Sequence, residues 1–172
     1  MDEQINSVLQ NLSYGLYALG ANNKGKAAGC IVNTVMQITN VTPIIATSIN
    51  LNTHTYDVIR KTGFFSVSVL SEKTDPGVIG KLGFFSGRNK DKFADIDFHW
   101  VDALPVIDSH ICCFATCEVV SMHMSNTHMV VLGRVMEAEN VENVPPMTYR
   151  YYREVVKGKA PKGAPTYIKE NA

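Results

Sequence analysis

Apolar residues in this chain gather in short, β-prone runs separated by turn residues. The first run covers residues 14–21, and a turn at 22–25 leads into a second run at 27–39. Two such runs joined by a short turn that contains glycine predict a β-hairpin. Later runs of the same character are expected to form further strands, at 44–50, 64–70, 110–123 and 128–138.

Helical patterns interrupt these runs. Apolar residues between Gln4 and Leu12 are spaced by three and four, which predicts a short helix. A second helix is expected to begin with Asn52 or Thr53 as its N-cap and to stop at Gly63, and a third is expected over 75–84. Because the alternating strand and helix rhythm of a parallel sheet is missing, the pattern favours a mainly β fold: a closed or nearly closed antiparallel barrel with helical insertions.

Other segments carry weaker patterns. Residues 86–95 read as a polar loop or a short helix, and residues 101–109, which contain Pro105, read as a connector. Glycine and proline recur at 157–165, which is typical of an extended linker or arm. The length of 172 residues suits one compact domain. We therefore expect a domain over residues 1–156 and an arm over 157–172.

Charge and hydropathy exclude several classes of partner. Sixteen Lys and Arg residues balance sixteen Asp and Glu residues, so no general attraction to nucleic acid or to an anionic membrane is expected. The first residues lack the basic start and apolar core of a signal peptide, and no apolar run approaches the roughly 20 residues that span a bilayer. The expected location is the cytoplasm, and any anion must be bound by a local site.

Familiar motifs for metals and nucleotides are missing from the sequence. No G-x-G-x-x-G follows an expected strand, and no G-x-x-x-x-G-K-[ST] occurs. Cys112, Cys113 and Cys117 do not form a C-x-x-C pair, which argues against a dithiol centre. His123 and His128 stand on either side of an expected turn, and no carboxylate or cysteine completes a ligand set. No metal site is expected.

Polar side chains inside apolar runs are the first chemical signal. Amides and hydroxyls recur within residues 29–39 and 44–50, and burying such a group without a partner costs roughly 1–3 kcal/mol. His128, which opens the last expected strand, can donate a hydrogen bond to a ligand or move protons, although a structural histidine fits the same position. These groups are expected to meet polar partners.

Two further segments can bind an anion. Residues 52–55 begin the second expected helix, where backbone N–H groups and the positive end of the helix dipole favour a phosphate. Helix capping explains the same residues. Residues 86–93 combine a glycine with three basic side chains, which suits an anion, although a solvated loop has the same composition. A phosphorylated planar cofactor fits this polar-lined barrel but is not identified by it.

In their order along the chain, these motifs resemble the flavin reductase-like family of FMN-binding split barrels. The similarity is greatest to the flavoredoxins and to the flavin domains of high-molecular-weight rubredoxins, and it covers nearly the whole chain. The motifs that carry it are Tyr14-Gly15-Leu16-Tyr17, the run from Gly29 to Thr39, Asn52-Thr53-His54-Thr55-Tyr56, the run from Phe64 to Leu70, Ser86-Gly87-Arg88 with Asp91-Lys92-Phe93, and the run from His128 to Val135.

The resemblance implies an FMN at the interface of a homodimer, and it implies roles for particular residues. The residues that it places along the isoalloxazine ring are Asn33, Thr34, Val35 and Gln37. Those that it places near the ribityl chain are Ser48 and Asn50. Near the phosphate it implies Asn52, His54, Thr55, Ser86, Gly87, Arg88 and Lys92. His128 matches a family histidine on the nicotinamide side and is the candidate catalytic residue.

The function implied by the resemblance is that of an FMN-dependent oxidoreductase. NADH or NADPH would deliver a hydride, and the electrons would pass to free flavin, a ferric complex or a redox protein. Residues 159–167 look like the linker of the rubredoxin fusions, so the acceptor is expected to be a separate partner such as a rubredoxin or a flavodiiron protein. The alternatives are a non-enzymatic flavoredoxin-type electron carrier reduced by a protein, and a haem- or ligand-binding split barrel without flavin.

Overall fold

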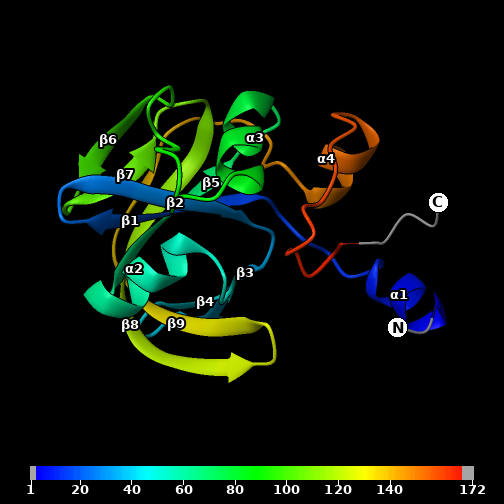
Figure 1. The fold of residues 1–172 in the computed structure, drawn as a ribbon, viewed down its shortest axis with the longest axis horizontal. Helices are drawn as coiled ribbons and strands as arrows, with labels where there is room; N and C mark the ends of the chain where they lie inside the picture. The colour runs from blue at the N-terminus through cyan, green and yellow to red at the C-terminus, as the bar shows by residue number, and fades with distance from the viewer. Residues whose placement is uncertain (1–2, 168–172) are drawn as a thin grey trace.

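The computed structural model describes residues 3–167, and one antiparallel sheet forms the centre of the fold. Its seven strands follow the order β2-β1-β5-β8-β9-β4-β3. Figure 1 shows these strands curling into a barrel. The bounds are β1 Tyr17–Asn23, β2 Lys26–Val32, β3 Val35–Thr39, β4 Ile44–Asn50, β5 Phe64–Leu70, β8 Ile111–Ser125 and β9 His128–Asn140.

The barrel is split between its two edge strands, β2 and β3. These strands lie at opposite ends of the strand order, yet only Asn33 and Thr34 separate them in the chain. Since the three residue steps from Val32 to Val35 reach at most roughly 11 Å, the two edges must approach each other there. The expectation of a single strand over 27–39 was wrong, because the chain changes its pairing partner from β1 to β4 at these residues.

Residues 101–109 are also more than a connector. β6 (Phe98–Val101) and β7 (Leu104–Ile107) form a separate two-stranded sheet. This hairpin lies on the barrel, where the Ser66 hydroxyl donates a hydrogen bond of 2.5 Å to the Pro105 carbonyl. Because β7 pairs with β6 alone, Pro105 can lie in the strand without breaking a second ladder.

The helices begin and end at capping residues. The Thr53 side chain accepts a hydrogen bond from the Tyr56 N–H at 3.2 Å, and Gly63 ends the helix with a φ of 77°. Asp75 caps the next helix by accepting from the Gly77 N–H. The sequence predicted the first three helices but not the fourth. Their bounds are α1 Glu3–Leu9, α2 His54–Thr62, α3 Pro76–Phe84 and α4 Tyr149–Glu154.

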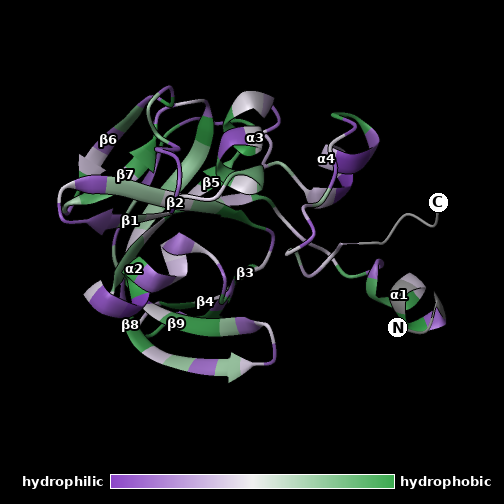
Figure 2. Cartoon of the chain, viewed as in Figure 1, coloured by the Kyte–Doolittle hydropathy of each residue, from purple (hydrophilic) through white to green (hydrophobic). Residues whose placement is uncertain are grey.

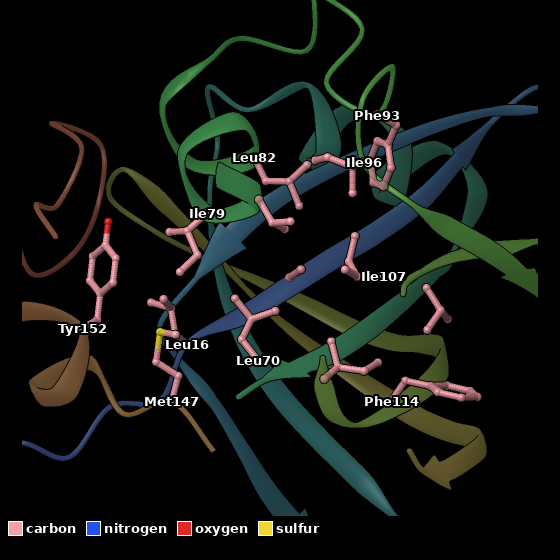
Figure 3. Packing of buried hydrophobic residues seen from close by; sticks show 14 residues of the cluster. Leu16, Leu70, Ile79, Leu82, Phe93, Ile96, Ile107, Phe114, Met147 and Tyr152 are labelled. Atoms are coloured by element: carbon pink, nitrogen blue, oxygen red, sulfur yellow. The ribbon is translucent and has the colours of Figure 1, made fainter. Parts of the chain in front are cut away.

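Apolar side chains pack on both faces of the sheet. Successive residues of β1 point to opposite faces, so Leu19 joins the cluster that contains Ile59 of α2, whereas Ala18 joins the cluster that contains Leu82 of α3. Figure 2 shows the apolar strands beside the mostly polar helix α2. Figure 3 shows the α3 cluster, which Tyr152 of α4 extends toward the C-terminal residues. Both faces therefore hold the barrel rigid.

The antiparallel barrel with helical insertions that the sequence predicted is confirmed. Within residues 3–167, no helix is long and apolar enough to cross a membrane. The division into a domain at 1–156 and an arm at 157–172 stays a prediction, and residues 1–2 and 168–172 lie outside the described residues.

Candidate functional site

A cavity of about 300 Å³ lies at the split of the barrel. Its lining comes from the ends of β2 and β4, the start of α2, the loop after α3, α4 and the C-terminal residues 159–166. Ligand pockets measure roughly 300–1,000 Å³, so the cavity is large enough for a small cofactor. Segments that are far apart in the sequence thus meet around one space.

The strand ends supply amide and hydroxyl side chains. Asn33, Ser48 and Asn50 line the cavity, as the sequence led us to expect of ligand-contacting residues. Asn33 is 6% exposed, and its Oδ1 accepts a hydrogen bond from the Thr34 hydroxyl at 3.1 Å. The Oδ1 of Asn50 accepts from the Asn52 N–H at 2.9 Å, which fixes the turn from β4 into α2. Asn52 lines the cavity as well.

The start of α2 forms the next part of the lining. Thr53 and His54 line the cavity, and the Thr53 side chain accepts the Tyr56 N–H. The other N–H groups of a first helical turn have no carbonyl partner within the helix, and the helix dipole makes this end positive. Thr55 lies deeper: it is buried and its hydroxyl is hydrogen-bonded to the Cys30 thiol.

Lys92 brings an ammonium group to the cavity. Its Nζ donates hydrogen bonds to the carbonyl of Gly29 at 3.0 Å and to the carbonyl of Leu82 at 2.7 Å. Burial lowers the pKa of Lys92, and the neighbouring Cys30 opposes that shift. An ammonium carries three N–H donors, so Lys92 keeps one for a ligand beyond the two carbonyls.

The two segments expected to bind an anion converge here. Ser86, Gly87, Lys92 and His54 line the same cavity. A Cβ placed on Gly87 would lie 3.4 Å from the His54 Cβ and 3.7 Å from the Lys92 Cε, so the glycine lets the loop approach both side chains. The positive start of α2 and the Lys92 ammonium therefore favour a negative charge at one end of the cavity.

Arg88 lies outside this cavity lining. Its Nη1 donates to the Asn52 carbonyl at 2.6 Å, and its Nη2 forms a 2.5 Å ion pair with the Asp57 carboxylate. Both groups belong to the start of α2, so Arg88 clamps the 86–92 loop onto that helix. Its expected contact with a phosphate stays a prediction.

Three other expected residues, Thr34, Val35 and Gln37, do not line the cavity. Val35 packs against the α2 cluster, and Gln37 is exposed on β3, where its Nε2 donates to the Thr39 carbonyl at 3.4 Å. Their expected position along a flavin ring stays a prediction, as does that of Thr55.

His128 also lines the cavity. It opens β9 opposite Asn50, and its Nδ1 is 2.9 Å from the Thr127 hydroxyl. Burial lowers the pKa of His128, while a hydrogen bond with the Gly163 backbone works in the opposite direction. The imidazole is therefore neutral at pH 7 and can exchange a hydrogen bond with a ligand.

No site role was predicted for α4 or for the residues that follow it. Tyr149 and Tyr152 line the cavity, and so do Lys159, Pro161 and Thr166. The Tyr149 hydroxyl is buried and has no hydrogen-bond partner among residues 3–167, which marks a polar group that a ligand could satisfy. In the sequence, the cluster of three tyrosines within residues 149–152 was the feature that could have pointed to this part of the site.

Chemically, the cavity combines anion-favouring groups with an apolar lining. Leu16, Ile49, Ile79 and Leu82 contribute the apolar side chains. Amides of Asn33 and Asn50 lie along the same lining. This arrangement suits a flat molecule that carries a phosphate. Among residues 3–167, no group of three or more His, Cys, Asp and Glu side chains is placed to hold a metal ion.

Comparison with known proteins gives consistent matches. Residues 9–159 match the flavin reductase like domain. The chain is 37% identical to the high molecular weight rubredoxin of Moorella thermoacetica over 92% of this chain and 70% of that protein. It is 30% identical to the ferric-chelate reductase (NAD(P)H) of Archaeoglobus fulgidus over 91% and 94% of the two chains.

A solved structure shares the fold. The flavoredoxin from Methanosarcina acetivorans aligns with a TM-score of 0.65 and 23% identity, over 76% of this chain and 70% of that one. At this identity the likeness establishes a common architecture and leaves the chemistry to the site itself.

Proposed function

The chain belongs to the flavin reductase like domain family, and we propose from that premise that it is an FMN-dependent oxidoreductase. In this proposal it takes a hydride from NADH or NADPH and passes the electrons to an acceptor. Bound FMN would supply a ring that accepts a hydride at N5 and releases electrons to a second partner. The relative named for NAD(P)H-dependent ferric-chelate reduction supports this reaction class.

The observation that carries the proposal is the convergence of Lys92 with the start of α2. The half-buried Lys92 ammonium, His54 and Gly87 lie together in the cavity lining, where a phosphate would accept hydrogen bonds from them. Arg88 then acts by clamping the loop to Asn52 and Asp57. We assign the phosphate end to these groups together with Asn52, Thr55 and Ser86.

The remainder of the cavity supports a flavin ring and its ribityl chain. Ser48 offers a hydroxyl in the lining. Asn50 and Asn33 add amides whose Nδ2 groups donate to the Gly163 carbonyl and to the Thr166 hydroxyl in this structure. Thr34, Val35 and Gln37 follow on β3 and would border the ring edge. The unpartnered Tyr149 hydroxyl is a further group that a bound cofactor would satisfy.

His128 would orient the nicotinamide. Burial lowers the pKa of His128, so the side chain is neutral at pH 7 and offers one N–H donor without repelling the positive nicotinamide that hydride loss creates. Proton transfer by a side chain is not required, because a hydride carries both electrons to the cofactor. The protein's task is to hold two rings face to face and to exclude water.

A second candidate function is a flavoredoxin-type electron carrier, which would bind FMN but receive electrons from a protein. The similarity to a high molecular weight rubredoxin and the fold shared with a flavoredoxin favour it. In either case the acceptor would be a separate rubredoxin, flavodiiron protein, ferric complex or free flavin. Rapid reduction by a protein together with indifference to NADH and NADPH would select the carrier.

The proposal includes a homodimer. Val8 and Leu12 near α1 are 63% and 55% exposed, and Figure 1 shows α1 standing apart from the barrel. Such an apolar helix side is unfavourable in water and would be covered by a second copy. Light scattering should give twice the mass of the chain, whereas a monomer that binds FMN at full affinity would contradict an interface site.

Stopped-flow mixing tests the reaction. The FMN-loaded protein should lose its visible flavin absorbance when mixed anaerobically with NADH or with NADPH. His128→Gln should slow this loss more than it weakens FMN binding. Absence of bleaching with both nucleotides would reject the reductase, and equal rates in the variant would remove His128 from the reaction.

Paired ligands test the phosphate end. Lys92→Met should weaken FMN binding by roughly 10- to 100-fold, the value of one charge-assisted hydrogen bond. Riboflavin lacks the phosphate, so its affinity should change little, which separates loss of the contact from damage to the fold. Lys90→Met is the matched control, because the Lys90 ammonium lies 4.7 Å from the centroid of the Phe85 ring and outside the cavity lining. A parallel loss of riboflavin affinity would reject the assignment of Lys92.

A further inference from the structure

Residues 160–167, here called the strap, form one part of the cavity wall. We infer that the strap is a cover that opens to admit and release the flavin and closes over it, so that FMN is a retained cofactor. This inference rests on the proposed function, because it concerns the exchange of that cofactor. Ala160, Pro161, Gly163, Ala164, Pro165 and Thr166 all line the cavity.

The strap begins at a fixed point. The Gly158 N–H donates to the Tyr152 carbonyl at 2.9 Å, and the Tyr152 hydroxyl donates to the Lys159 carbonyl at 3.3 Å. A Cβ on Gly158 would lie 2.0 Å from the Tyr152 ring, so only glycine fits there. Tyr152 is 6% exposed and belongs to the α3 cluster. The base of the strap is therefore tied to the core of the protein. Lys157, with a φ of 60°, turns the chain toward this base.

The far part of the strap is held by side chains of the cavity itself. The Nδ2 of Asn50 donates to the Gly163 carbonyl at 2.9 Å, and the Nδ2 of Asn33 donates to the Thr166 hydroxyl at 2.8 Å. His128 also forms a hydrogen bond with the Gly163 backbone. Residues proposed to face the flavin and the nicotinamide are thus the residues that latch the strap.

Opening the strap costs little. None of residues 160–167 is buried, and this segment belongs to no strand of the sheet. Segments with few buried apolar contacts open locally without unfolding of the domain. Pro161 and Pro165 restrict the backbone, so the segment should move as a stiff unit about its base.

The strap covers a space rather than filling it. A cavity of about 300 Å³ remains beneath it, and Tyr149, whose buried hydroxyl has no hydrogen-bond partner among residues 3–167, contributes to its lining. A segment that mimicked the ligand would occupy this room and satisfy the hydroxyl. The geometry therefore favours a cover over a competitor.

The strap also lies beyond the part of the chain that matches the family, which ends at residue 159. The barrel, α2 and the 86–92 loop fall within that match. The inferred control of flavin exchange therefore concerns residues outside the matched range.

Kinetics distinguish a cover from other roles. A cover slows both entry and exit, so removing it should raise the association and dissociation rate constants together. A segment that only contacts the flavin would, when removed, raise dissociation alone. A competing segment would, when removed, raise association alone and tighten binding.

Two truncated chains provide the test. One ends at Lys159, which keeps the base with Tyr152, and the matched control ends at Tyr167, which keeps both latches. FMN binding and release are followed by the change in flavin fluorescence after rapid mixing. In the chain ending at Lys159, both rate constants should rise roughly fivefold, which corresponds to about 1 kcal/mol of net latch energy. Thr166→Val, which removes a single latch, should raise both by a smaller factor.

A measurement without flavin keeps the strap testable even if the proposed function fails. Cys30 lines the cavity and is 4% exposed, whereas Cys117 is 0% exposed and does not line it. Alkylation by N-ethylmaleimide, mapped by mass spectrometry, should be several-fold faster at Cys30 in the chain ending at Lys159 than in the chain ending at Tyr167. Cys117 should react equally slowly in both.

The outcomes separate the two proposals. Equal Cys30 alkylation in the two chains, or a change in only one of the two flavin rate constants, would overturn the strap while FMN binding stands. Failure of the full chain to bind FMN would reject the proposed function, and the Cys30 result would still decide whether the strap covers the cavity.

Discussion

The cavity has two walls of unlike construction. The sheet wall, formed by Asn33, Ser48, Ile49 and Asn50 with the start of α2, belongs to the barrel, and Ile49 in it is 1% exposed. The strap wall, residues 160–167, contains no buried residue and is latched by hydrogen bonds from the sheet wall. A fixed surface can orient a ligand, while a weakly held one can regulate its access. The two tasks are thus divided between core and surface.

The largest expected effect comes from the sheet wall. Ile49→Ala removes a fully buried side chain from the α2 cluster and should lower the free energy of unfolding by roughly 2–5 kcal/mol. Urea unfolding measures this. Val41→Ala, at a residue that is 92% exposed, is the control and should change stability by less than about 0.5 kcal/mol. A small loss in Ile49→Ala would mean that the sheet wall is no more rigid than the strap.

Two helix caps compare the walls directly. Thr53 caps α2 on the sheet wall, and Thr148 caps α4, which leads into the strap, by accepting from the Tyr151 N–H at 3.0 Å. Removal of a cap costs about 1 kcal/mol. Thr53→Ala should therefore lower the global free energy of unfolding by about that amount.

Thr148→Ala should act mainly on its own side of the cavity. Hydrogen exchange should become faster in α4 and the strap, while urea unfolding changes less than in Thr53→Ala. Equal loss of global stability in the two variants would show that the two walls unfold as one unit.

Local signals explain why the sequence predicted the sheet wall well. The run at 44–50 coincides with β4, and Thr53 and Gly63 mark both ends of α2, because strand propensity and capping depend on neighbouring residues. The family was also predicted correctly from motifs of this part of the chain. The split between β2 and β3 was missed, since the β-prone pattern continues through Asn33 and Thr34 while the pairing partner changes.

The strap wall depends on contacts that no local pattern encodes. Glycine and proline predicted an extended arm, but the hydrogen bond between Asn33 and Thr166 joins residues 133 positions apart. The same limit applies to Arg88, whose charge suggested an anion contact while its ion pair with Asp57 depends on how the loop folds onto α2. Gly87, Lys92 and His54 lie close together in the structure. From the sequence, their proximity was a hypothesis, which followed from the idea that both segments bind one phosphate.

A pH titration tests the contact between His128 of the barrel and Gly163 of the strap. His128 belongs to β9 but meets Gly163 of the strap, and burial lowers its pKa below the usual 6.5. The unfolded chain therefore binds a proton more readily than the folded chain, and stability is lost as the pH falls from about 6.5 through the folded pKa. Between pH 7 and pH 5, unfolding free energy should fall more steeply in the native chain than in His128→Gln. Parallel curves would mean that His128 is as solvated in the folded chain as in the unfolded one.

The smallest expected effect comes from deleting the strap wall. Each latch contributes a net of about 0.5–1.5 kcal/mol, and ordering the segment offsets much of that gain through lost backbone entropy. The chain ending at Lys159 keeps Tyr152 and its contacts, so its global free energy of unfolding should lie within about 1 kcal/mol of that of the chain ending at Tyr167. Calorimetry of the two flavin-free chains measures the difference. A loss of more than about 2 kcal/mol would place the strap in the core, and a segment so firmly packed could not open often enough to control flavin exchange.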